Sequence, residues 1–131
     1  MGVKFTIVER SFFYFFNSFW YNYSKFVEIK LPDSLKIIGN YAFENCSKLK
    51  SIYIPKSVNY IGNNIFHGCK ALENIEVDKD NTVYDSRNSC NAIIETARDK
   101  MIAASSNTII MDNVSDIANG IFAGFSILTD T

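Results

Sequence analysis

The residues with the clearest potential for chemistry are a histidine and a cysteine two positions apart, His67 and Cys69. A thiol that is deprotonated by a nearby imidazole is a nucleophile of the kind used in acyl transfer. The surrounding sequence argues against that chemistry. The segment IGNYAFENC, which ends at Cys46, recurs as IGNNIFHGC, which ends at Cys69, so the two thiols share an inward position. Because a buried structural thiol is inert, we predict no catalytic residues. Side chains stacked in parallel rarely reach the dihedral angle of a disulfide, so we also predict no bridge between Cys46 and Cys69.

A second candidate cluster consists of Asp85, Ser86 and Arg87, in the polar stretch DSRNSCN. Hard metal ions require several carboxylate or carbonyl ligands, and one aspartate without a histidine is a poor set. We therefore interpret the stretch as a surface loop in which Cys90 is an unpaired thiol. The sequence contains no glycine-rich phosphate loop, no HExxH and no GxSxG, and it predicts neither a metal nor a cofactor.

The global composition is that of an ordinary globular domain. The chain has 131 residues, of which 47% are hydrophobic and 21% charged, with a net charge of -1 and a mean hydropathy near zero. This balance gives no electrostatic footprint for nucleic acid or an anionic membrane, so we expect no nucleic-acid partner and no membrane insertion. The aromatic run Phe12–Tyr23 is shorter than the roughly 20 apolar residues of a membrane span. A signal peptide is the alternative to core packing there, but no small-x-small cleavage pattern follows.

An internal sequence repeat determines the elements that position these residues. One unit, FVEIKLPDSLKIIGNYAFENCS (Phe26–Ser47), is followed by LKSIYIPKSVNYIGNNIFHGCK (Leu49–Lys70), and the apolar, proline and glycine positions coincide. The separation of Cys46 and Cys69 along the chain is therefore one repeat period. A third unit begins at Leu72, where the pattern is interrupted. The pattern reappears in Ile110–Leu128, which aligns with the unit that follows Ile54 but lies ten residues further along the chain than two regular periods would place it. One unit is longer than its neighbours by that amount, and the insertion lies within Asp78–Asn107.

A period in the low twenties is typical of stacked repeats, because one short strand and its return path cannot bury an apolar stripe alone. The L-x-x-I-x-I alternation predicts the strand, and Pro32 and Pro55 end it. We expect Gly39 and Gly62 to form a bend and the Ala/Ile-Phe-x-x-Cys segments to form one inward helical turn. Stacking then predicts a ladder along one axis from Phe43, Phe66 and Phe122.

The two ends differ from the regular units. We interpret residues 1–25 as an N-terminal cap or degenerate repeat and residues 26–131 as the repeat array, with 78–107 as the longer unit. Val3–Val8 is a candidate for one further strand. The C-terminal repeat is incomplete, and we favour a fragment or a naturally truncated chain. Shifting the repeat's apolar positions back by one period gives only aromatic residues, at Phe12, Phe15, Phe19, Trp20 and Tyr23.

The pattern L-P-x-S-L-x-x-I-G-x-Y-A-F-x-x-C-x-x-L-x-x-I-x-I-P at Leu31–Pro55 resembles the BspA-like leucine-rich repeat of surface proteins. The longer unit resembles a family variant in which a segment such as Asn81–Thr96 precedes a hairpin, here between NAIIET and KMIAAS. Ala118 and Phe125 depart from the repeat's glycine and cysteine. The resemblance implies an α/β solenoid, a right-handed superhelix of short parallel strands with short helical or 3-10 turns. It also implies a nonenzymatic, cell-surface or extracellular protein whose partner is a protein, for example an extracellular or surface protein of a host.

Candidate binding residues lie on the outward face of the predicted strands, where successive repeats form a column. Tyr53 is the expected anchor, because exposed aromatic residues are enriched at binding hot spots. The alternative is a solvated strand face with no ligand. We therefore predict a protein-interaction module of an adhesin-like surface protein, or else a structural spacer or intracellular scaffold fragment. The column comprises Lys30, Tyr53 and Glu76, flanked by Glu28, Ser51 and Asn74.

Overall fold

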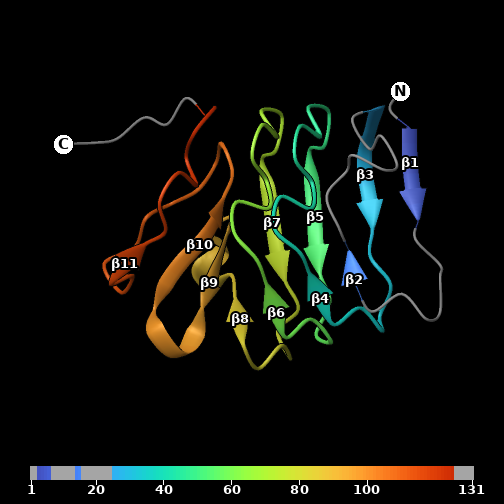
Figure 1. The fold of residues 1–131 in the computed structure, drawn as a ribbon. Helices are drawn as coiled ribbons and strands as arrows, with labels where there is room; N and C mark the ends of the chain where they lie inside the picture. Colours follow the sequence, from blue (N-terminus) through green and yellow to red (C-terminus); the bar gives the residue numbers. More distant parts are fainter. Residues whose placement is uncertain (1–2, 7–13, 16–24, 126–131) are drawn as a thin grey trace.

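The computed structural model of this chain describes residues 3–6, 14–15 and 25–125, which form three sheets of short strands (Figure 1). The first sheet has the order β1 (Val3–Thr6), β3 (Phe26–Lys30), β5 (Ser51–Ile54) and β7 (Asn74–Val77). The second has the order β2 (Tyr14–Phe15), β4 (Ile37–Ile38) and β6 (Tyr60–Ile61). The third has the order β11 (Asp116–Ile117), β10 (Lys100–Ala104), β9 (Ala92–Glu95) and β8 (Tyr84–Asp85).

Equivalent strands of successive repeats pair in parallel at the predicted spacing. Ile52 in β5 lies opposite Ile75 in β7, and Ile38 in β4 lies opposite Ile61 in β6. The two partners of each pair are one repeat period apart along the chain, so the sequence period is also the register of the sheets. Alternate residues of β5 and β7 point into the core, as the period-two pattern requires.

The N-terminal strands extend the two sheets in parallel; β2 keeps the one-period register with β4, whereas the pairing of β1 with β3 shifts by one residue after Val3. β1 pairs in parallel with β3, and Phe15 in β2 lies opposite Ile38. The strand expected within Val3–Val8 is therefore present as β1. The division at residue 25 between a cap and the repeats stays a prediction. The other aromatic positions of the predicted cap lie outside the described residues: Phe12, Phe19, Trp20 and Tyr23.

The return path of each repeat is a chain of tight turns rather than the helical turn we expected. Cys46 N donates a hydrogen bond to Phe43 O at 3.1 Å, and Cys69 N donates to Phe66 O at 3.0 Å. Left-handed backbone recurs at two positions of each return path, which favour asparagine and glycine. The φ values at these positions lie between 48° and 89°. The first position is occupied by Tyr41, Asn64 and Gly120 in successive repeats, and the second by Asn45, Gly68 and Gly124.

Gly62 is needed for a close approach and not for a left-handed bend, since its φ is not in the positive region. A Cβ at this position would lie 2.7 Å from Asn40 N and would also collide with the Asn40 side chain. That side chain is fixed, because its Oδ1 accepts a hydrogen bond from Asn63 N at 2.7 Å. The glycine therefore lets two successive turns stack in contact.

The core of the regular repeats is continuous, and the expected phenylalanine ladder is only partly present. The rings of Phe43 and Phe66 stack with their centroids 5.7 Å apart and an interplanar angle of 28°. Phe122 instead packs against a second cluster of buried residues that includes Ile94 and Met101. The expectation was wrong for Phe122 because β9 and β10 stand between the regular repeats and the last one (Figure 1).

The long repeat occupies that intermediate place. β9 and β10 pair antiparallel and are joined by η4 (Thr96–Arg98), and β8 lies on the other side of β9. Neither β6 nor β7 has a further backbone partner on its outer side in the described residues. Side chains of the long repeat take the place of that strand. Ile61 N donates to Tyr84 OH at 2.8 Å, Val77 N donates to Ser86 Oγ at 3.0 Å, and Ile75 N donates to Asn91 Oδ1 at 3.4 Å.

Asn81 links the long repeat to the repeat before it. Its Nδ2 donates hydrogen bonds to Pro55 O at 3.0 Å and Val58 O at 2.9 Å. Its Oδ1 accepts from Val83 N at 2.9 Å and Tyr84 N at 2.8 Å. One amide thus satisfies four backbone groups, two on each side of the junction, which fixes where the long repeat begins.

Candidate functional site

The six residues predicted for the strand face lie together along one groove with a volume of about 630 Å³. They come from three successive strands, β3, β5 and β7, whose parallel register brings equivalent positions side by side. Loop residues of the long repeat, which we had interpreted only as a surface loop, close one end of the groove: Ser86, Ser89 and Asn91. The predicted column is therefore a groove whose end wall the sequence reasoning missed.

Tyr53 stands at the middle strand of this strand-face groove, with 46% of its surface exposed. Its hydroxyl donates a hydrogen bond to Asp78 Oδ2 at 2.6 Å. That hydrogen bond, reinforced by desolvation and by nearby carboxylates, raises the pKa of Tyr53 to about 12. The same bond, with one from the Asp80 amide, holds the pKa of Asp78 below its usual value. The ring is therefore held in one orientation on the open face.

The groove around Tyr53 carries more negative than positive charge. Glu28, Asp33 and Glu76 line it, whereas Lys30 is its only cationic lining residue within the described residues. The carboxylates of Glu76 and Asp33 add to the rise in the pKa of Tyr53, because nearby negative charge disfavours its ionised form. A ligand for this surface would meet an aromatic ring bordered by carboxylates.

The predicted loop cluster is an ion pair that organises the long repeat. Arg87 contacts Asp85 through Nε and Nη2, at 2.7 and 2.8 Å, and reaches Asp99 Oδ1 at 2.8 Å. Thr96 Oγ1 donates to Asp85 Oδ2 at 2.6 Å. Burial alone would raise the pKa of Asp85, but the hydrogen bonds from Arg87 and Thr96 outweigh it and lower that pKa. The Asp85 carboxylate is thus already engaged within the protein.

The loop prediction was wrong for Cys90, which is fully buried. Its N–H donates to Arg87 O at the end of η3 (Arg87–Ser89), and its side chain packs with Ala92 and Ile94. Burial raises the pKa of the Cys90 thiol, so the neutral form dominates. The polar residues around this cysteine predicted an exposed loop, but the chain turns inward at Cys90 before β9 begins at Ala92.

His67 and Cys69 lie in different surroundings. Cys69 is buried and its Sγ donates to Phe43 O at 3.0 Å. The neighbouring thiol of Cys46 and burial both raise the pKa of Cys69. His67 is exposed, and its ring meets the ring of Tyr41 edge to face at 5.9 Å. All three cysteines are free thiols.

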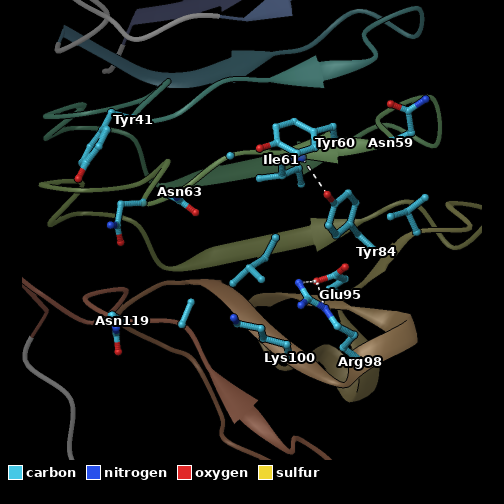
Figure 2. Close-up of a pocket in the computed structure, with 15 residues that line it drawn as sticks. Tyr41, Asn59, Tyr60, Ile61, Asn63, Tyr84, Glu95, Arg98, Lys100 and Asn119 are labelled. Carbon is cyan, nitrogen blue, oxygen red and sulfur yellow. Dashed lines mark hydrogen bonds and ion pairs between the residues drawn. The ribbon is translucent and has the colours of Figure 1, made fainter.

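A second groove, of about 590 Å³, lies beside β6 and was not predicted (Figure 2). We call it the β6 groove. Tyr60 and Tyr41 are exposed on one wall, and Arg98 and Lys100 come from the opposite side. Two of its polar residues, Asn63 and Asn119, share the repeat position of Asn40, but the periodicity that revealed the core gave no sign that polar side chains line a groove here. They include Asn59, Asn63, Asn64 and Asn119.

The short parallel strands, their common register and the recurring turn define a protein of the leucine-rich repeat class. A family model for the BspA type leucine-rich repeat region matches residues 13–130 in six copies. The chain belongs to this BspA-type leucine-rich repeat family, which confirms the resemblance seen in its sequence. None of the curated proteins matches the chain.

Three solved structures are similar to the chain. A leucine-rich cell surface protein from Faecalibacterium prausnitzii is 25% identical with a TM-score of 0.75, over 95% of this chain and 34% of that one. The pneumococcal vaccine antigen PcpA is 21% identical with a TM-score of 0.78, over 95% and 31%. A leucine-rich repeat protein from Eubacterium ventriosum is 22% identical with a TM-score of 0.59, over 80% and 38%. The chain spans about a third of the length of these proteins.

Membership of the family narrows the functional class. Leucine-rich repeat domains generally mediate protein interactions, and this repeat family is typically nonenzymatic. In the part of the chain that the structure describes, no helix is long and apolar enough to cross a membrane. The same residues contain no group of three or more His, Cys, Asp or Glu side chains arranged to hold a metal ion.

Proposed function

We propose that this chain is a protein-interaction module that binds its partner in the strand-face groove, with Tyr53 as the anchor. The observation that carries the proposal is the convergence of all six predicted residues on one groove around a held, half-exposed tyrosine. A ring that is already fixed loses little conformational freedom on binding, which is what makes aromatic residues effective anchors.

The partner in this proposal presents a basic segment. Three carboxylates and one lysine line the groove, and Asp78, which lies near Lys56 and Lys79, adds a further carboxylate at the Tyr53 hydroxyl. Arginine or lysine side chains would neutralise these carboxylates and stack over the exposed ring. The attraction between charges at an exposed rim weakens with salt, so binding should weaken as ionic strength rises.

The proposal also covers the cellular location of the module and the winding of its repeats. The similar proteins include one described as a cell surface protein and one described as a vaccine antigen, which supports a place at a bacterial surface and an adhesin-like role. We further infer that the repeats wind as one right-handed solenoid and that β9 and β10 form the hairpin of its longer unit. The second candidate, a spacer without its own ligand, is favoured by no particular feature of the groove.

Selection from a random peptide library tests the proposal without a known ligand. The library is panned on the wild-type chain, and the recovered peptides are measured by calorimetry against the wild type and Tyr53→Ala. We expect basic peptides whose affinity falls about 30-fold in Tyr53→Ala, the effect of a hot-spot residue worth about 2 kcal/mol. The matched control is Tyr60→Ala, which alters an exposed tyrosine outside this groove and should bind normally. Recovery of no basic peptides, or equal binding by Tyr53→Ala, would contradict the proposal.

A further inference from the structure

The β6 groove exists because the long repeat departs from the regular path. After β6, a further regular unit would add a parallel strand at Tyr84, one repeat period beyond Ile61. The strand that begins there, β8, instead pairs antiparallel with β9, and the second sheet ends at β6. An apolar floor is left between β6 and the strands beyond it, formed by Ile61, Val83, Ile102 and Ala118.

The backbone edge in this groove is not open to an added peptide strand. The N–H that Ile61 would offer to a neighbouring strand is already donated to Tyr84 OH (Figure 2). The Tyr84 side chain is buried, and burial is the main factor that raises the pKa of its hydroxyl. Because strand addition relies on such edge groups, recognition in this groove must use side chains.

The side chains that line the groove could bind a ligand that carries both hydroxyl groups and a flat apolar surface. Tyr60 and Tyr41 are 55% and 38% exposed. Each asparagine amide carries both donors and an acceptor, which matches a hydroxyl that donates and accepts at once. Sugar rings combine such hydroxyls with an apolar face of C–H groups that packs against an aromatic ring. Four asparagines line the groove: Asn59, Asn63, Asn64 and Asn119.

The charges around the groove compensate one another, which argues for an uncharged ligand. Arg98 donates from Nε and Nη2 to Glu95 Oε1 at 2.9 and 2.6 Å. Lys100 Nζ lies 3.7 Å from Asp116 Oδ2. Each cation of the groove therefore has an anion of the protein beside it. This contrasts with the strand-face groove, where carboxylates are in excess.

We propose that the β6 groove binds a neutral saccharide, which stacks on Tyr60 while its hydroxyl groups pair with the asparagine amides. The volume of about 590 Å³ lies within the range of small-ligand sites. This site is independent of the protein-binding groove, which uses none of the same residues.

Chemical-shift mapping on the whole chain tests the proposal. The probes are cellobiose, maltose, lactose and N,N'-diacetylchitobiose at up to about 20 mM, above the millimolar Kd of weak ligands. Sialyllactose and a neutral β-strand peptide serve as competing ligand classes. We expect at least one neutral sugar to shift the amide signals of Tyr41, Tyr60, Asn63 and Asn119.

Variants then separate stacking from a general loss of fold. Tyr60→Ala should weaken the sugar at least tenfold while its melting temperature stays near that of the wild type, and Tyr60→Phe, which keeps the ring, should retain binding. Tyr53→Ala should bind the sugar normally, so failure here is distinguishable from failure of the protein-binding proposal. The saccharide site is refuted if no neutral sugar shifts these signals, if only sialyllactose or the peptide does, or if Tyr60→Ala binds as well as the wild type.

Discussion

The regular repeats and the long repeat satisfy the backbone hydrogen-bonding groups at their strand edges in different ways. In the regular repeats, each strand is completed by the backbone of a near-copy, as where β5 pairs with β7 residue by residue. In the long repeat, the outer edges of β6 and β7 are completed by side chains, namely Tyr84, Ser86 and Asn91. A repeat array therefore accepts an irregular unit when polar side chains satisfy the backbone groups that lose their partner.

The difference also explains where the two grooves lie. The strand-face groove runs across regular strands and ends at the loop of the long repeat. The β6 groove lies where the second sheet stops and the long repeat begins. The regular units therefore build the scaffold, and the irregular unit shapes both of the grooves that we propose to bind ligands.

The largest expected effect comes from breaking the regular stack at its centre. Phe66→Ala removes a buried ring that stacks on Phe43 and should lower the free energy of unfolding by about 3–5 kcal/mol. Chemical denaturation measures this loss. Phe122→Ala is the matched control, because that ring is only partly buried and lies in the other cluster. An equal loss in both variants would mean that the regular stack is no more tightly packed than the last repeat.

The next effect concerns the junction between the two regions. Asn81→Ala removes one hydrogen bond from each of four backbone groups, of which Pro55 O keeps its bond from Val58 N, and should cost about 2–3 kcal/mol. Asn81→Asp keeps the acceptor toward Val83 and Tyr84 but loses the donor toward Pro55 and Val58. Because its second carboxylate oxygen then faces those two carbonyl oxygens, denaturation at neutral pH should show a loss at least as large as in the alanine variant. Wild-type stability of Asn81→Ala would show that the amide does not hold the junction.

A smaller effect is expected from acid within the long repeat. Arg87 and Thr96 lower the pKa of Asp85 in the folded chain, so the pair contributes stability above the unfolded pKa of about 3.9. That contribution is lost as pH falls through the lower, folded pKa. Asp85→Asn should consequently show a smaller difference in stability between pH 7 and pH 3 than the wild type. Thermal melts at the two pH values measure it, and an unchanged difference would contradict the assignment.

The smallest effect on stability is expected at Tyr53, on the exposed strand face. Its folded pKa of about 12 lies above the usual 10, so the hydrogen bond to Asp78 stabilises the fold below pH 10 and is lost as pH rises through 12. NMR titration of the tyrosine ring should show ionisation near pH 12 in the wild type and closer to 10 in Asp78→Asn. Ionisation of Tyr53 at the same pH in both proteins would exclude the bond.

The regular half of this molecule was predictable and the irregular half was not. Ile38 and Phe43 recur one repeat period later because burial in a stack demands the same apolar type at the same place. Tyr53 and its neighbours on the strand face were found from the same alternation. The hydrogen-bonding role of Asn81 was not predicted, because a polar residue in a loop has the same sequence signature whether it faces water or completes a buried edge. Cys90 was misplaced for the same reason.

Hydrogen exchange of single backbone amides tests most directly whether side chains complete the edges that the long repeat leaves. In the wild type, the amides of Ile61 and Val77 should exchange slowly although neither has a backbone partner beyond the sheet in the part of the chain that the structure describes. Tyr84→Phe should speed exchange at Ile61 alone, and Ser86→Ala should speed it at Val77 alone. Fast exchange of both amides in the wild type, or slow exchange that survives both substitutions, would show that these side chains do not complete the strand edges.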